Sequence, residues 1–185
     1  MMKVAVLLAT GFEEAEALFT TNILRRAEIK TDLVTINDKK EVVGAHDMKI
    51  VADKIFDDSI YDYDMIVLPG GLPGATNLRD DERVIKAVQY FNDNDKYIGA
   101  ICAAPIVLKK AGIIKGKKVT SYPGFEDELE GAEYLQDKVV KDGKLITARG
   151  PAITMDFAYS IVEMLGYDSS LLKEGMLYNM LMKTK

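Results

Sequence analysis

Short, wholly apolar segments alternate along the chain with segments of helical hydrophobic spacing, and this alternation constrains the fold more than any other feature. The apolar runs have the length of strands covered on both faces, and they comprise residues 3–8, 65–68 and 97–101. Apolar residues at three/four spacing follow them in residues 13–26, 81–92 and 103–111. The pattern predicts an α/β fold with a doubly wound, mostly parallel sheet and helices on both faces.

The remaining segments fit the same architecture. Further strands are predicted at residues 31–36, at 118–121 and, as short strands around Gly44, within 41–51. A hairpin that turns at Asp142-Gly143 is expected within 134–148, and amphipathic helices at 153–165 and 171–182. No low-complexity linker or repeat divides the sequence, so we expect residues 1–185 to form a single domain.

Composition argues against several classes of protein. The net charge of −5 gives no domain-wide positive field, so we expect no sequence-specific nucleic-acid partner. No apolar run reaches the roughly 20 residues of a membrane span, and we expect no membrane association. A single cysteine fits a reducing, cytoplasmic location. One histidine and one cysteine are too few for a zinc site of the His/Cys type, and we expect no metal.

Cys102 lies at a predicted strand-to-helix junction. Ala100 and Ala104, two positions to either side, have the small side chains that the tight turn of a nucleophile elbow requires. Pro105 suits the first turn of the following helix, whose N-terminus lowers the pKa of a nearby thiol. The segment therefore indicates a nucleophilic cysteine, although a lone cysteine is also commonly a small buried hydrophobic residue.

Two backbone positions near this junction are candidates for an oxyanion hole. Gly71, after the strand at 65–68, allows its N–H to approach a reacting oxygen closely, and Ala103 follows the candidate nucleophile directly. The pair Gly70-Gly71 is equally typical of a flexible turn.

Acidic residues open the first helix. Glu13, Glu14 and Glu16 suit a helix N-terminus because of its dipole, but one of them could reach Cys102 at the same sheet edge. A desolvated carboxyl held protonated beside a thiolate could donate a hydrogen bond and transfer protons. For His46, in the segment around the short strands, we expect a surface or interface role.

Four segments in order, at residues 13–16, 68–71, 100–105 and 147–151, resemble the ThiJ/PfpI superfamily, in the branch of the Parkinson's-disease deglycase. The resemblance covers residues 3 to about 165. It implies a flavodoxin-like fold, related to the class I glutamine amidotransferases, and a homodimer. It also implies a reactive Cys102 that is hydrogen-bonded by a protonated Glu16, with Gly71 and Ala103 as oxyanion donors.

The same resemblance implies which residues line the pocket: Gly70, Tyr122, Arg26, Gly150, Pro151 and His46. Relatives often carry a histidine, thought to help proton transfer, where this chain has Tyr122. A phenol is a poor base at neutral pH because it ionises only near pH 10. Glu16 would then act alone as acid and base.

The resemblance favours an enzyme without cofactor that acts on small α-oxoaldehydes, converting methylglyoxal to lactate without glutathione, or on early glycation adducts of proteins or nucleotides. The alternative is a redox-responsive stress protein or chaperone in which Cys102 oxidises to sulfinic acid. A cysteine peptidase or amidase is less favoured, because no histidine is expected beside Cys102.

Overall fold

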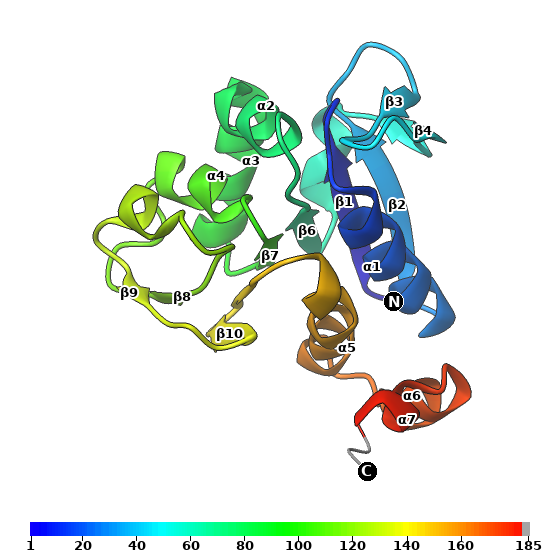
Figure 1. The fold of residues 1–185 in the computed structure, drawn as a ribbon. Coiled ribbons are helices and arrows are strands. Elements are labelled where there is room, and N and C mark those ends of the chain that lie inside the picture. Colours follow the sequence, from blue (N-terminus) through cyan, green and yellow to red (C-terminus); the bar gives the residue numbers. More distant parts are fainter. Residues whose placement is uncertain (183–185) are drawn as a thin grey trace.

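The computed structural model describes residues 1–182, and its main feature is a seven-stranded sheet. In spatial order the strands are β10 (Val139–Asp142), β11 (Leu145–Ala148), β7 (Tyr97–Ile101), β6 (Met65–Leu68), β1 (Lys3–Leu8), β2 (Lys30–Thr35) and β5 (Lys54–Ile55). All neighbours are parallel except β10 and β11, which form the predicted hairpin. Figure 1 shows how the other elements surround this sheet.

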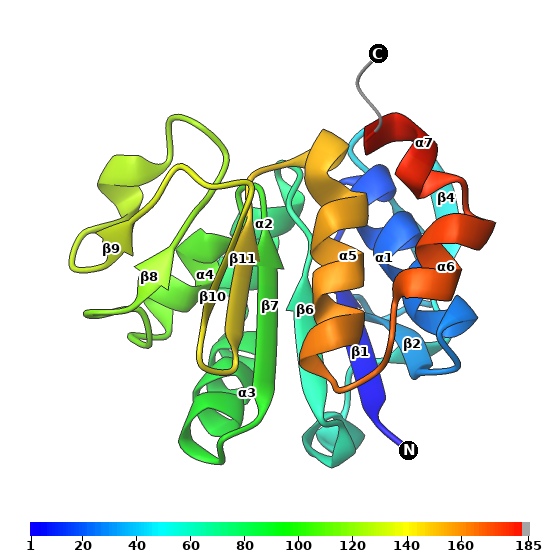
Figure 2. The same cartoon turned by 90° about the horizontal axis from the view of Figure 1, so that it is seen from below.

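Helices cover both faces of the sheet (Figure 2). On one face lie α1 (Glu14–Arg26) and α5 (Thr154–Met164); on the other lie α2 (Gly74–Asp80), α3 (Glu82–Asp93) and α4 (Pro105–Lys110). This arrangement confirms the predicted flavodoxin-like α/β fold.

Strand β1 explains why its sequence is apolar at every position. Ala5 and Leu7 belong to the core beneath α2, α3 and α4, whereas Val4, Val6 and Leu8 belong to the core beneath α1 and α5. Successive side chains of a strand point to opposite faces, so a strand between two helical layers buries all of them. These residues of β1 have no exposed surface.

Two small strand pairs lie outside the main sheet. Strands β3 (Glu41–Val43) and β4 (Lys49–Val51) are antiparallel, as predicted for the segment around Gly44. Strands β8 (Lys118–Val119) and β9 (Glu133–Tyr134) pair in parallel. The predicted strand at 118–121 therefore ends early, and the start of the predicted 134–148 hairpin belongs to a different pair.

The C-terminal segment differs from its prediction. Residues 171–182 were expected to form one helix, but the structure has α6 (Ser170–Gly175) and α7 (Tyr178–Met182). Leu177, between them, has a φ of 59°, which right-handed helix cannot contain. Helix α2 was not predicted, because its opening residues Pro73-Gly74 are typical of a turn.

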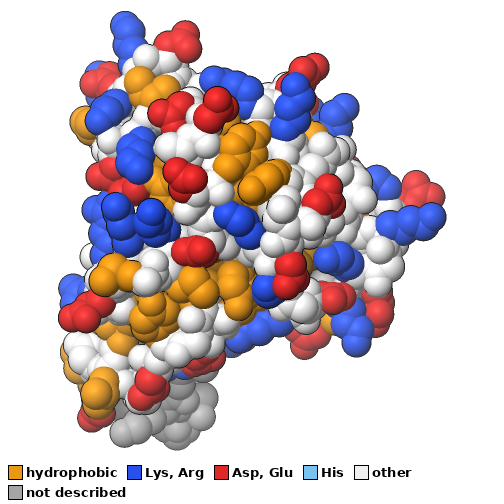
Figure 3. Space-filling model, turned by 180° about the vertical axis from the view of Figure 1, so that it is seen from behind, with side chains coloured by type: hydrophobic (Ala, Val, Ile, Leu, Met, Phe, Trp, Pro, Cys, Tyr) orange, Lys and Arg blue, Asp and Glu red, His pale blue; other side chains and the backbone are white. Residues whose placement is uncertain are grey.

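Several large hydrophobic side chains of α6, α7 and their connection are exposed: Leu171, Leu177, Met180 and Leu181. Figure 3 shows hydrophobic side chains gathered on the lower part of one face. Exposed apolar patches are typical of interaction surfaces, and the homodimer that the resemblance implies stays a prediction.

Within residues 1–182, no helix has both the length and the hydrophobicity needed to cross a bilayer.

Candidate active site

The sheet order brings the candidate functional loops together at one edge. Strands β11, β7, β6 and β1 are consecutive neighbours in the sheet, and the four segments singled out in the sequence follow their carboxyl ends. Ligands of open α/β sheets bind at this edge.

Cys102 occupies a strained turn between β7 and α4. Its φ is 63°, in the left-handed region that residues other than glycine rarely adopt. The turn is held on both sides: the Cys102 N–H donates to the carbonyl of Ala148 (2.9 Å), and the Tyr122 N–H donates to the carbonyl of Cys102 (2.9 Å). Pro105 is the first residue of α4, where its missing N–H costs nothing. The backbone therefore has the shape of a nucleophile elbow, with the side chain partly exposed.

Glu16 reaches this turn from the first turn of α1, and its side chain is buried. Its Oε2 accepts a hydrogen bond from the Gly70 N–H (2.7 Å), whereas Oε1 has no hydrogen-bond partner within residues 1–182. Burial raises the pKa of Glu16 from 4.5 to about 7, against the opposing effect of hydrogen bonds from Gly70 and Cys102. A carboxyl with this pKa exchanges its proton readily at neutral pH.

The pKa of the Cys102 thiol differs from the sequence-based expectation. We expected the N-terminus of α4 to lower it, but burial and, second, the charge of Glu16 together raise the pKa from 9.0 to about 12. The Ala103 and Gly71 N–H groups favour the thiolate but do not outweigh these two effects. The thiol thus keeps its proton at neutral pH and needs a base, for which Glu16 is the adjacent candidate.

Gly70 is a glycine because the site leaves no space for a larger residue. A Cβ on Gly70 would lie 2.7 Å from the Cys102 Cβ and 2.9 Å from the Glu16 Oε2. These are distances that real Cβ atoms do not show, so the glycine is what allows the cysteine and the carboxyl to meet.

Gly71 is constrained in two ways: its φ is +82°, and a Cβ would lie 2.3 Å from the backbone nitrogen of Glu13. We expect Gly71→Ala to lower the free energy of unfolding by about 3 kcal/mol or more, because strain and overpacking combine. Gly112→Ala is the matched control, since Gly112 has a φ of +78° with nothing within 4 Å. That variant should lose only about 1 kcal/mol.

Urea unfolding of both variants measures this difference. Equal losses for the two substitutions would show that close packing around Gly71 does not constrain the site.

A cavity of about 400 Å³ opens above Cys102. It brings together these predicted residues: His46, Gly71, Cys102, Ala103, Tyr122 and Pro151. Gly150 lies behind Tyr122, where a Cβ would be 3.1 Å from the ring. Two apolar residues that also line the cavity, Leu72 and Phe125, were not predicted, because neither side chain carries a reactive group.

Arg26 does not reach this cavity. It lies at the other end of α1, donates to Asn22 (2.9 Å) and borders a separate groove with Arg25. The expectation that Arg26 lies beside the pocket is therefore wrong within this chain, because α1 runs away from the sheet edge after Glu16.

Glu14 has a role that its place at a helix start did not indicate. Its buried carboxylate accepts hydrogen bonds from the His46 N–H (2.8 Å) and the Met48 N–H (3.4 Å) and contacts the His46 Nδ1 (2.9 Å). Burial alone would raise the pKa of Glu14, but the hydrogen bonds from His46 and Met48 outweigh it and lower the pKa below 4.5. Glu14 thus fixes the β3–β4 turn, with His46, at the mouth of the cavity.

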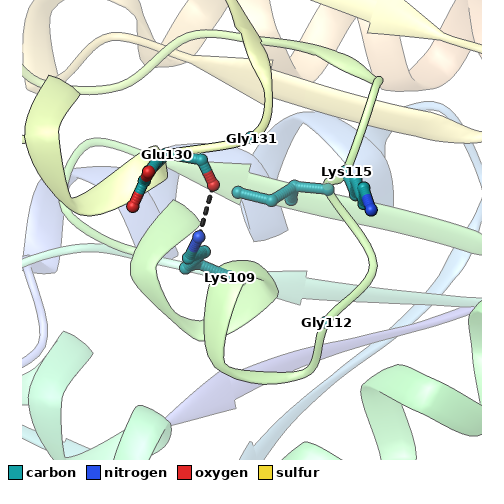
Figure 4. A pocket seen from close by; sticks show the side chains of 6 residues that line it. Lys109, Gly112, Lys115, Glu130 and Gly131 are labelled. Atoms are coloured by element: carbon teal, nitrogen blue, oxygen red, sulfur yellow. Dashed lines mark hydrogen bonds between the residues drawn. The ribbon is translucent and has the colours of Figure 1, made fainter.

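Another hollow, of about 380 Å³, lies beyond the C-terminal end of α4 (Figure 4). The Lys109 ammonium on its wall is already bonded to the carbonyl of Glu130. Neither Cys102 nor the lone histidine lies there. The cavity at Cys102 is the better candidate for chemistry.

A doubly wound sheet with a cysteine on a strained elbow, a buried carboxyl beside it and backbone N–H groups around the sulfur defines a class of α/β proteins with a cysteine at the sheet edge. Comparison with known sequences specifies the family: the profile of the DJ-1/PfpI family matches residues 2–164, and the chain belongs to this family.

Individual relatives agree with this assignment. The chain is 37% identical over 163 residues to "Protein DJ-1 homolog B" of Arabidopsis thaliana, covering 87% of this chain but only 37% of that protein. It is 32% identical over 174 residues to "Glutathione-independent glyoxalase DJ-1" of Schizosaccharomyces pombe, covering 88% and 91% of the two chains. The crystal structure of Drosophila melanogaster DJ-1beta superposes with a TM-score of 0.91 at 37% identity, over 95% of this chain and 97% of that one.

Proposed function

We propose that this protein is a glutathione-independent, cysteine-dependent enzyme that converts small α-oxoaldehydes such as methylglyoxal to 2-hydroxy acids such as lactate. The observation that carries the proposal is the buried Glu16 carboxyl beside Cys102, whose pKa burial raises to about 7. The glyoxalase name of the S. pombe relative supports the same reaction class.

The first step forms a carbon–sulfur bond. The Cys102 sulfur attacks the aldehyde carbon while the ionised Glu16 carboxylate takes the thiol proton. The resulting oxyanion lies against the N–H groups of Gly71 and Ala103, which already favour negative charge on the adjacent sulfur. Proton transfer from Glu16 to this oxygen gives a neutral hemithioacetal and restores the carboxylate.

The next steps move hydrogen between the two carbons. Glu16 removes the proton from the former aldehyde carbon, giving an enediolate, and returns it to the neighbouring carbon. The hydroxyl proton of the first carbon passes to the oxygen of the second, which leaves a thioester of the 2-hydroxy acid on Cys102. The first carbon is thereby oxidised and the second reduced, so the balance needs no external oxidant. Water then cleaves the thioester, releasing the 2-hydroxy acid and the Cys102 thiol.

The same steps directed at early glycation adducts of proteins or nucleotides would constitute deglycase activity. Leu72 and Tyr122, which line the cavity and are 55% and 47% exposed, leave its mouth open to a larger substrate.

Lactate formation tests the proposal. Purified protein is supplied with methylglyoxal in the absence of glutathione, and both compounds are followed over time, with heat-denatured protein as the control. We expect one lactate for each methylglyoxal consumed. Loss of methylglyoxal without lactate would show that the protein only forms adducts with the aldehyde, and the proposal would then be withdrawn.

Two other hypotheses were drawn from the sequence, a redox-responsive protein and a cysteine peptidase. A redox response of Cys102 stays a prediction. For a peptidase, the lone histidine would have to act as base to the cysteine, but its Nδ1 is engaged with Glu14 at the cavity mouth. This contact disfavours a Cys–His pair.

A further inference from the structure

Glu13, Glu14 and His46 form a cluster of potential metal ligands at the mouth of the cavity. One ligand atom from each lies within 4.8 Å of the other two. The two glutamates come from the start of α1, whereas His46 comes from the turn between β3 and β4. No metal was predicted from the sequence, because only cysteine and histidine were counted as ligands.

The separations within the cluster fit a small transition-metal ion. The His46 Nδ1 lies 2.9 Å from the Glu14 Oε2 and 3.6 Å from the Glu13 Oε2. Ligand atoms placed about 2.0–2.2 Å from a tetrahedral zinc ion are roughly 3.3–3.6 Å from one another. The two observed distances bracket this spacing. His46, with 65% of its side chain exposed, is free to make the small adjustment that remains.

The two oxygens of Glu14 have separate tasks. Oε1 accepts the N–H groups of His46 and Met48, which holds the β3–β4 turn against α1. Within residues 1–182, the imidazole of His46 is the one hydrogen-bond partner of Oε2, so an ion inserted between the two would replace a single contact. The ligand geometry is therefore built before any ion arrives, which lowers the cost of binding.

The charge of the cluster also favours a cation. Two carboxylates face one imidazole, and within residues 1–182 neither carboxylate forms an ion pair with a lysine or arginine. Glu13 and His46 also line the cavity that contains Cys102. An ion held here would keep its remaining coordination positions facing the cavity, as open metal sites do.

We propose that Glu13, Glu14 and His46 bind one divalent transition-metal ion of the zinc class at the mouth of the cavity. The proposal is independent of the aldehyde chemistry, and it is tested in the Cys102→Ser background so that the thiol cannot bind the metal.

The test is a titration of the full chain with Zn²⁺ in competition with a chromophoric chelator. We expect one Zn²⁺ per chain in Cys102→Ser. Adding His46→Gln or Glu13→Gln should weaken binding at least tenfold, since even the loss of an outer-shell partner costs 10–100-fold. Glu41→Gln is the matched control: it removes the same charge from exposed β3, outside the cluster, and should leave the affinity within twofold.

Cobalt gives a second readout. Co²⁺ bound to Cys102→Ser should show the visible d–d absorption of a four- or five-coordinate site. The absorption should be lost when His46→Gln is added to Cys102→Ser. No stoichiometric Zn²⁺ binding, or equal affinity in Cys102→Ser with and without His46→Gln, would overturn the proposal and leave the cluster as an ion pair of His46 with two carboxylates. Circular dichroism of each variant verifies that the fold is intact.

Discussion

Cys102→Ser should reduce the conversion of methylglyoxal to lactate by at least about a thousandfold in kcat/KM. Removal of a nucleophile eliminates the covalent route, and only the contribution of binding and the oxyanion donors remains. Serine is close to cysteine in size, so the strained turn at φ 63° and its hydrogen bonds to Ala148 and Tyr122 should persist. Initial rates of lactate formation measure the effect.

Cys102 is the only cysteine in the chain, so no other thiol can substitute for it in this variant. Urea unfolding should give a midpoint close to that of the wild type, which separates lost chemistry from lost structure. Turnover within a few-fold of the wild-type rate would exclude a covalent role for the sulfur.

Glu16→Gln should lower kcat by about 10²–10⁴-fold, the usual contribution of a general acid or base. Glutamine has nearly the same shape and can still accept the hydrogen bond from the Gly70 N–H, but it cannot take the thiol proton or move one between carbons. Glu82→Gln, an exposed glutamate at the start of α3, is the matched control and should leave kcat unchanged.

The role of Glu16 as a base also predicts how kcat/KM changes with pH. Because Glu16 must be ionised to act as base and its pKa is raised to about 7, wild-type kcat/KM should fall as the pH drops below about 7. Any residual activity of Glu16→Gln should lack that inflection. If Glu16→Gln kept the wild-type kcat and the wild-type pH dependence of kcat/KM, Glu16 would have no part in the mechanism.

Much of the site could be predicted because strand ends are visible in sequence. The apolar runs that became β1, β6 and β7 are covered on both faces, and each is followed at once by an unusual loop. Parallel strands of one sheet end at one edge, which places Glu16, Gly71 and Cys102 together once the fold class is known.

What the sequence could not provide depends on distances across the fold. The pKa of Cys102 is set by how deeply the sulfur is buried against Glu16, which no local pattern encodes. Arg26 shares a helix with Glu16, yet ten residues of helix carry it about 15 Å along the axis and away from the cavity. The charge of Glu14 alone explains its place at a helix start, so nothing in the sequence pointed to its contacts with His46, in a turn some thirty residues later.

Titration of the Glu16 carboxyl itself tests the proposed chemistry at its source. It is followed by carbon-13 NMR of side-chain-labelled glutamate in the wild type and in Glu16→Gln. The result expected is one carboxyl with a midpoint at about pH 7 that is missing from the variant. Identical spectra, with no glutamate titrating near pH 7 in either protein, would mean that no proton is held beside Cys102 at neutral pH, and the proposed chemistry would have no acid or base to drive it.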